Sequence, residues 1–168
     1  ACYFTDQSLG DFFEAVKQTT WYKNTLFVLV ADHGSNLPAG RTFYEPARYH
    51  IPLIFFGEVL KEEFLGKKIN SMGSQTDIAT TLLKQLQLPS TAFKWGNDLL
   101  NLNRSQFAFY TFDDGFGWLT EKDTFLFDNR AKRLLPSAHK TENTTTRNAT
   151  LWNGKAYMQS LYDAFLKY

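Results

Sequence analysis

An aspartate and a histidine stand side by side in this sequence, directly after an apolar run. The stretch TLFVLVADHG (residues 25–34) has six apolar residues in its first seven, and then Asp32, His33 and Gly34 follow. A carboxylate oxygen and an imidazole nitrogen are ligands that Zn²⁺ and Mn²⁺ accept. Adjacent strand residues point to opposite faces, so both side chains reach one ion only if the chain has left strand geometry, which Gly34 permits. A second interpretation stays open, in which Asp32 caps a turn and His33 is a partly buried, hydrogen-bonded side chain.

The elements that must position this pair indicate an α/β fold. Two apolar runs, at residues 25–31 and 51–56, are typical of buried strands. Apolar residues at helical spacing predict amphipathic helices at 5–18 and 76–88. We therefore expect the two strands to be neighbours in a mainly parallel sheet with both helices packed against it. In open sheets of this kind, ligands bind beyond the carboxyl ends of the strands, where the aspartate and histidine stand.

The sequence changes its character after about residue 104. Short aromatic-rich runs separated by DDGFG and EKD predict a small antiparallel sheet at about 107–135, with its aromatic residues at alternating core positions rather than on a sugar-stacking platform. The polar stretch 139–150 reads as a loop, and residues 156–168 as a terminal amphipathic helix. We therefore divide the chain into an α/β portion, 1–104, and an antiparallel subdomain with a terminal helix, 105–168.

The composition excludes several classes of protein. Lys and Arg total 18 and Asp and Glu total 17, so the chain carries no broad positive charge for binding nucleic acid. No apolar run approaches the roughly 20 residues that span a bilayer. The single cysteine, Cys2, excludes an internal disulfide framework. The 43% of hydrophobic residues is typical of a globular protein with a substantial core.

Four sequence blocks follow one another between residues 24 and 100. They are NTLFVLVADHG, RTFYEPARYHIPLIFFG, GSQTDIATTLLKQLQLP and FKWGNDLL. In this order they resemble the alkaline phosphatase/sulfatase superfamily, and most of all its lipoteichoic acid synthase-like phosphoglycerol transferases. The later segment FYTFDDGFGWLT also looks like a C-terminal subdomain of that group. The resemblance implies a partial alkaline phosphatase/sulfatase-like fold.

The same resemblance implies that Asp32 and His33 are paired ligands of a divalent metal ion, which is manganese, zinc, magnesium or calcium. In these enzymes the metal activates a Thr or Ser nucleophile, replaced by formylglycine in true sulfatases, and neutralises charge on the transferred group. The nucleophile and another acidic ligand belong to the first half of the family's domain, which this chain does not match. We therefore assign no catalytic nucleophile and expect the isolated chain to be inactive without that missing N-terminal half.

Two further residues are candidates for substrate binding. His50 precedes Pro52 by two residues, at a position where sulfatases often have Arg and lipid-A phosphoethanolamine transferases have His. The other interpretation, that His50 is a histidine at the start of a strand without a role in binding, stays equally open. Arg41, in GRTFYE, lies near the place of a sulfate-binding Lys in sulfatases, and its planar fork suits a tetrahedral oxyanion. A solvated surface arginine is the other interpretation. Gln75 and Asp77 match the family's Q-x-D helix start, and helix capping explains them sufficiently.

The function expected from the resemblance is the transfer or hydrolysis of phosphate or sulfate esters, lipid-linked and glycan-linked esters included. The same resemblance implies an extracytoplasmic catalytic domain of a membrane-anchored parent protein, of which this part is soluble. An exposed sheet edge would also favour self-association. The alternatives are a sulfatase or phosphoethanolamine transferase within the superfamily, or a non-catalytic α/β binding module.

Overall fold

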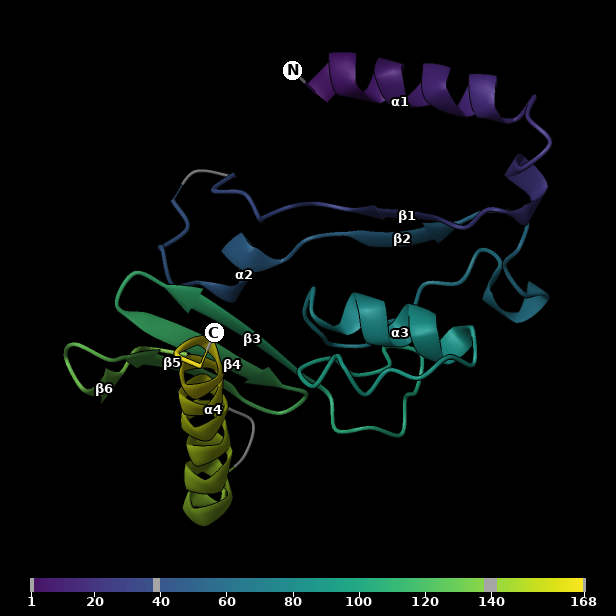
Figure 1. Cartoon of the computed structure of the whole chain (residues 1–168). Helices are drawn as coiled ribbons and strands as arrows, with labels where there is room; N and C mark the ends of the chain where they lie inside the picture. The colour runs from purple at the N-terminus through teal and green to yellow at the C-terminus, as the bar shows by residue number, and fades with distance from the viewer. Residues whose placement is uncertain (1, 38–39, 138–141, 168) are drawn as a thin grey trace. The chain divides into compact units, whose positions relative to one another are not determined.

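The computed structural model describes residues 2–37, 40–137 and 142–167, and Figure 1 traces the chain. The fold consists of two compact units. The first unit comprises Ala1–Ser35 and His50–Lys68, and the second unit comprises Asn36–Tyr49 and Ile69–Tyr168. Each unit is described by itself below. The boundary expected at residue 104 stays a prediction.

The first unit contains a two-stranded sheet with a helix packed on it. Its elements in chain order are α1 (Cys2–Val16), η1 (Tyr22–Asn24), β1 (Phe27–Val30), β2 (Leu53–Phe56) and η2 (Glu62–Phe64). The prediction that the two apolar runs form neighbouring strands is confirmed.

The predicted parallel direction of these strands is wrong, because β1 and β2 pair antiparallel, from Phe27 opposite Phe56 to Val30 opposite Leu53. A run of apolar residues indicates burial but carries no information on strand direction. A parallel pair also needs a crossover connection, usually a full helix. Among its described residues the connection here contains one helix, the four-residue α2 (Pro46–Tyr49), and it returns to the end of the sheet from which it left.

Aromatic side chains attach α1 to the strands. The ring of Phe13 lies 5.2 Å from the ring of Phe27 and 5.2 Å from that of Phe56, both edge to face. Edge-to-face pairs are a favourable arrangement because the positive ring edge meets the negative ring face. Val16, in the last turn of the helix, is buried. The amphipathic helix predicted at 5–18 is therefore confirmed, with its start three residues earlier.

The second unit is built around an antiparallel meander. Its elements are α2, α3 (Asp77–Gln85), β3 (Phe107–Phe112), β4 (Gly115–Thr120), β5 (Thr124–Asp128), β6 (Arg133–Leu134) and α4 (Thr144–Phe165). The four strands lie in sequence order and every pair is antiparallel, as predicted for 107–135. The core is a buried aromatic cluster, which confirms the core interpretation of these side chains: Phe116, Trp118, Phe125 and Phe127.

Helix α4 is longer than predicted. The polar residues 144–150 were expected to form a loop but make the first two turns of this helix. The reason is an N-cap, since the side chain of Asn143 accepts hydrogen bonds from the backbone N–H groups of Thr145 and Thr146, at 2.9 and 3.1 Å. Figure 1 shows α4 lying beside β4, where Gly154 is buried. The remainder of the expected loop, residues 139–141, lies outside the described residues.

A buried carboxylate holds the start of α3. Asp77 is only 2% exposed and accepts hydrogen bonds from the backbone N–H of Ser74, at 2.8 Å, and of Asn97, at 2.7 Å. The first of these bonds resembles the backward half of a capping box, but the N-cap position of α3 is Thr76, which makes no side-chain cap bond. The second bond ties the loop that contains Asn97 to the helix. Asp77 therefore acts in the framework of the second unit.

Candidate metal centre

The Asp-His pair lies just beyond β1, where the chain has left strand geometry. β1 ends at Val30, and Asp32 and His33 belong to no strand. The chain bends at Asp32 and His33, and the backbone N–H of His33 donates to Oδ1 of Asp32 at 2.9 Å, which holds this carboxylate against the backbone. The two side chains lie on the same side of this turn, with Nε2 of His33 3.7 Å from Oδ2 of Asp32. This separation agrees with the 3 to 4 Å expected of two ligand atoms that share one ion.

A backbone carbonyl sets the orientation of the imidazole. Nδ1 of His33 lies 2.7 Å from the carbonyl oxygen of Gly34. A carbonyl oxygen only accepts hydrogen bonds, so we assign the proton of the neutral ring to Nδ1. The lone pair is then on Nε2, which is the nitrogen that faces the carboxylate of Asp32. Metal-binding histidines commonly donate their other ring N–H to a carbonyl or carboxylate in this way.

The donor atoms of the pair fit a divalent metal ion. Both side chains are open to solvent, with exposed fractions of 82% for His33 and 88% for Asp32. Two acceptor atoms 3.7 Å apart lie within reach of one ion at metal–ligand distances of about 2.0–2.2 Å. Among the described residues, however, no group of three or more His, Cys, Asp and Glu side chains is placed to hold a metal. The pair therefore offers two of the three or four protein ligands that a metal site normally has.

The antiparallel register places His50 at the same end of the sheet as this pair. Asp32 and His33 follow the last residue of β1, Val30, whose partner Leu53 is the first residue of β2. His50 lies three residues before Leu53 and is exposed. In a parallel pair, a residue before the second strand would lie at the opposite end from residues that follow the first strand. The antiparallel direction thus brings His50 to the same end of the sheet as the pair, which favours a substrate-binding role for it there.

Arg41 belongs to the other unit and has a partner in its own loop. Its guanidinium donates from Nη1 to the carbonyl oxygen of Ala47, at 2.8 Å, which fastens the GRTFYE segment to α2. Sequence reasoning did not anticipate this bond. An arginine has five N–H donors, so one such contact leaves capacity for an oxyanion. The substrate-binding role of Arg41 remains a prediction.

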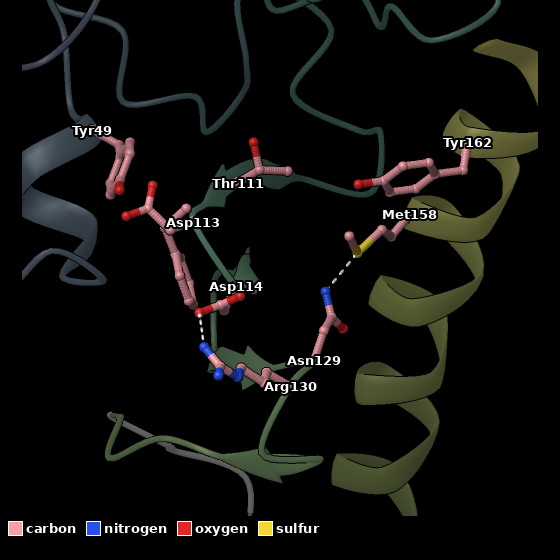
Figure 2. Close-up of a pocket in the computed structure, with 10 residues that line it drawn as sticks. Tyr49, Thr111, Asp113, Asp114, Asn129, Arg130, Met158 and Tyr162 are labelled. Atoms are coloured by element: carbon pink, nitrogen blue, oxygen red, sulfur yellow. Dashed lines mark hydrogen bonds and ion pairs between the residues drawn. The ribbon is translucent and has the colours of Figure 1, made fainter. Parts of the chain in front are cut away.

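The structure also contains a hollow that the sequence analysis did not predict. It opens at the β3–β4 turn, in the second unit, and has a volume of about 710 Å³ (Figure 2). Asp113 and Asp114 of the turn line it, together with Tyr49 and residues of α4. Burial raises the pKa of Tyr49, with a smaller lowering by the charge of Arg48 and a raising by that of Asp113, so this phenol remains protonated at neutral pH. The segment FYTFDDGFG was the available signal, since two carboxylates occupy an exposed hairpin turn.

Comparisons with known proteins agree with the family expected from the four sequence blocks. The sequence profile of the sulfatase family matches residues 1–88, which is more than half of the chain. Arylsulfatase K of Canis lupus familiaris is 30% identical over 110 residues, covering 63% of this chain and 20% of that protein. A sulfatase of Formosa agariphila is 33% identical over 103 residues, covering 59% of this chain and 20% of that protein.

A solved structure has the same fold. It is a protein in the alkaline phosphatase superfamily from Vibrio parahaemolyticus, which superposes with a TM-score of 0.67 at 21% sequence identity. The superposition covers 95% of this chain and 41% of that one. The expected α/β fold of the alkaline phosphatase superfamily is thereby confirmed, although the strands that are resolved pair antiparallel.

The family matches indicate which cofactor and which cellular location are usual for proteins of this kind. The chain spans about a fifth of the length of the curated relatives it matches. Sulfatases generally depend on a divalent metal ion and are often extracytoplasmic or lysosomal. In the part of the chain that the structure describes, no helix is both long and apolar enough to cross a membrane. With more than half of its residues matched by the family profile, this chain belongs to the sulfatase family.

Proposed function

We propose that this chain is the C-terminal part of a metal-dependent enzyme that transfers or hydrolyses phosphate or sulfate esters, and that Asp32 and His33 are two of its metal ligands. The observation that carries this proposal is the 3.7 Å separation between Nε2 of His33 and Oδ2 of Asp32. The bond from Nδ1 of His33 to Gly34 supports it, because it leaves Nε2 as the free acceptor. A divalent ion at this pair would neutralise charge on the transferred group.

The residues around the pair have distinct parts in this proposal. Asp32 supplies negative charge that offsets the charge of the cation, and it also accepts the N–H of His33, which holds the turn in place. His50, three residues before β2, presents an imidazole near the same end of the sheet. There it would donate a hydrogen bond to an ester oxygen or to a ligand of the metal. The guanidinium of Arg41 would donate two further hydrogen bonds to the oxygens of the oxyanion.

Within the superfamily we favour a lipoteichoic acid synthase-like phosphoglycerol transferase, with a sulfatase as the alternative. The order of the four blocks and the FYTFDDGFGWLT segment support the first, and the curated relatives support the second. A phosphodiester and a sulfate monoester both present a tetrahedral group with one negative charge. A metal ion held by Asp32 and His33, together with the guanidinium of Arg41, therefore suits either substrate. The alcohol to which the phosphate or sulfate is esterified would decide which of the two is used.

We further propose that the missing N-terminal half of the enzyme supplies the nucleophile and covers the first unit. Among the described residues the sheet of this unit has only two strands, which are marginally stable by themselves. Its strands also carry exposed apolar side chains, with exposed fractions of 42% for Val30, 53% for Ile54 and 39% for Phe56. Additional strands of the same polypeptide would bury them. Pairing with a second copy of this chain is the alternative occupant of the edge.

A titration of the 168-residue chain with Mn²⁺ tests the metal assignment. Paramagnetic broadening of backbone amide signals in NMR should concentrate on residues 31–34, with weak affinity, because closed sites offer three or four protein ligands. Asp32→Ala and His33→Ala should each abolish the localised broadening. Asp6→Ala provides the matched control, since Asp6 is exposed and lies on α1. Broadening that survives both substitutions at the pair would refute the assignment.

A further inference from the structure

The hollow at the β3–β4 turn collects residues that lie far apart in the sequence. We call it the hairpin hollow. Its volume of about 710 Å³ falls within the range of roughly 300–1,000 Å³ typical of ligand sites. All of its residues belong to the second unit, so it is independent of the Asp-His pair. The lining residues that matter here are Tyr49, Asp113, Asp114, Asn129, Arg130 and Tyr162.

Backbone hydrogen bonds fix the walls of the hairpin hollow. The backbone N–H of Asn129 donates to the carbonyl oxygen of Asp114 at 2.7 Å, which joins the β5–β6 turn to the β3–β4 turn. The backbone N–H of Arg130 donates to Oδ1 of Asp128 at 2.9 Å. A Cβ on Gly115 would lie 2.2 Å from the carbonyl oxygen of Phe127, so the hairpin can be this tight only with glycine. The backbone of the two turns is therefore organised before any ligand binds, which lowers the cost of binding.

An aromatic stack fixes the remaining wall. The ring of Tyr49 stacks on that of Tyr110 with centroids 4.1 Å apart, and its hydroxyl donates to the carbonyl oxygen of Phe43 at 2.6 Å. The hydroxyl of Tyr110 in turn donates to the carbonyl oxygen of Tyr44 at 2.7 Å. Tyr49 is thereby held in one position and presents ring surface to the hollow. Such surface suits the C–H groups of a ligand.

The polar side chains of the hairpin hollow have weak partners in the structure. Nδ2 of Asn129 donates to the thioether sulfur of Met158 at 3.5 Å, and a thioether is a weak acceptor. Nη1 of Arg130 lies 3.9 Å from Oδ2 of Asp114, which exceeds hydrogen-bond distance. The side chain of Asp113 is exposed. Figure 2 shows the hydroxyl of Tyr162 directed toward the space between these groups.

The mixture of donors and acceptors selects one class of ligand. Carboxylates such as Asp113 and Asp114 only accept hydrogen bonds, whereas the guanidinium of Arg130 only donates them. An anion would be repelled by the two carboxylates, and the arginine offsets part of their attraction for a cation. Each hydroxyl of a neutral sugar both donates and accepts, so neighbouring hydroxyls satisfy both kinds of group at once. The amide of Asn129 and the hydroxyl of Tyr162 match such a ligand equally well.

We propose that the hairpin hollow binds a neutral saccharide, through Asp113, Asp114 and Arg130 at its hydroxyl groups. The ester-bearing glycan of the proposed reaction and a separate cell-surface glycan share this chemistry. The site itself does not depend on a metal or on turnover.

The test uses the 168-residue chain in the presence of EDTA, so that failure of the metal assignment cannot affect it. The chain is applied to an array of neutral, sulfated and amino-bearing oligosaccharides, and the strongest neutral glycan is titrated by NMR. We expect neutral glycans to bind and to shift the amide signals of Asp113, Asn129 and Tyr162. Binding of glycans that also carry the cleavable ester would identify the substrate as the source, whereas equal binding of ester-free glycans would identify a separate one.

Two variants and a control complete this test. The double variant Asp113→Asn, Asp114→Asn should preserve the hairpin turn, because asparagine is as common in turns as aspartate. It should weaken glycan binding by about tenfold or more, because it removes two charged hydrogen-bond acceptors. Asn129→Ala should weaken glycan binding by several-fold, because it removes an amide that lines the hairpin hollow from the β5–β6 turn. Asp163→Asn is the matched control on α4 outside the lining and should leave the affinity unchanged. No binding of neutral glycans at about 20 mM, a preference for charged glycans only, or unchanged binding by the double variant would overturn the proposal.

Discussion

Nε2 of His33 lies 3.7 Å from Oδ2 of Asp32, while Nδ1 of the same ring lies 2.7 Å from the carbonyl oxygen of Gly34. Two acceptors that face each other at this distance repel unless a proton or a cation lies between them. The glycine carbonyl fixes which nitrogen faces the carboxylate. This turn therefore places two potential ligand atoms of a cation close together, although both side chains are open to solvent.

The first prediction concerns catalysis by a longer polypeptide that contains this chain. Asp32→Ala or His33→Ala should remove nearly all activity on a phosphoglycerol lipid or p-nitrophenyl sulfate, because each deletes a metal ligand. His50→Ala should leave more activity and reduce kcat/KM by about 10- to 100-fold, as expected of a residue that acts around the ligands. The 168-residue chain alone should show no turnover. Full activity of Asp32→Ala would exclude a catalytic metal at this turn.

The second prediction concerns the buried carboxylate of Asp77. Asp77→Ala leaves the backbone N–H groups of Ser74 and Asn97 without their acceptor, and each bond to a charged group contributes about 1.5–3 kcal/mol. Urea denaturation should therefore show a loss of about 3 kcal/mol or more in the free energy of unfolding of the second unit. Asp163→Ala, on the exposed face of α4, should change it by about 0.5 kcal/mol or less. Equal stability of the two variants would contradict a framework role for Asp77.

The third prediction compares the same substitution at two helical glycines. A Cβ on Gly154 of α4 would lie 2.9 Å from Cβ and from Cγ of Trp118, which is 6% exposed and cannot move aside, so Gly154→Ala should destabilise the second unit. A Cβ on Gly10 of α1 would meet nothing within 4 Å, so Gly10→Ala should stabilise its helix by about 0.5–1 kcal/mol. Hydrogen exchange measured separately on α4 and α1 reports both effects. A stabilising Gly154→Ala would show that α4 does not pack on β4 this closely.

The fourth prediction concerns stability at high pH. Burial raises the pKa of Tyr110, and Tyr49 nearby raises it further; burial also raises the pKa of Tyr157. A raised pKa in the folded state means that folding favours the protonated phenol. This stabilisation is complete below the unfolded value of about 10 and is lost as the pH rises through the folded value.

The free energy of unfolding should accordingly fall above about pH 10, by up to about 1.4 kcal/mol per pH unit for each of these tyrosines. Urea midpoints measured between about pH 9 and 11.5 give the slope. Tyr110→Phe should make the slope shallower, and Tyr3→Phe should not, because Tyr3 is 81% exposed. The comparison rests on slopes, since Tyr110→Phe also removes the hydrogen bond to Tyr44. A slope that Tyr110→Phe leaves unaltered would contradict the expectation.

Local signals in the sequence were sufficient for the existence of most elements. The helix at α3 has a capping pattern at Ser74 and Asp77 and an apolar face, and the meander has short aromatic runs separated by turn residues. The Asp-His turn was also recognisable, because an acid and an imidazole follow an apolar strand directly. These features depend on neighbours within a few residues along the chain.

Features that depend on distant contacts could not be predicted. The apolar runs of β1 and β2 do not encode direction, so the antiparallel register was missed. The first turns of α4 contain no apolar stripe, and only the Asn143 cap and packing at Gly154 explain their helical form. The hairpin hollow requires four segments to meet, which no local pattern indicates.

The antiparallel pairing of β1 and β2 also bears on how this protein can evolve. Residues 31–52 leave the sheet and return to it at one end, so their length is not constrained by any need to reach the other end. The entropic cost of closing a loop rises only slowly with its length. Insertions and deletions between Gly34 and Arg41 can therefore accumulate in descendants without disturbing the strand register, the Asp-His turn or the contacts that Phe43, Tyr44 and Tyr49 make with β3. In this segment, changes of loop length that favour new substrates would therefore cost the folded state little stability.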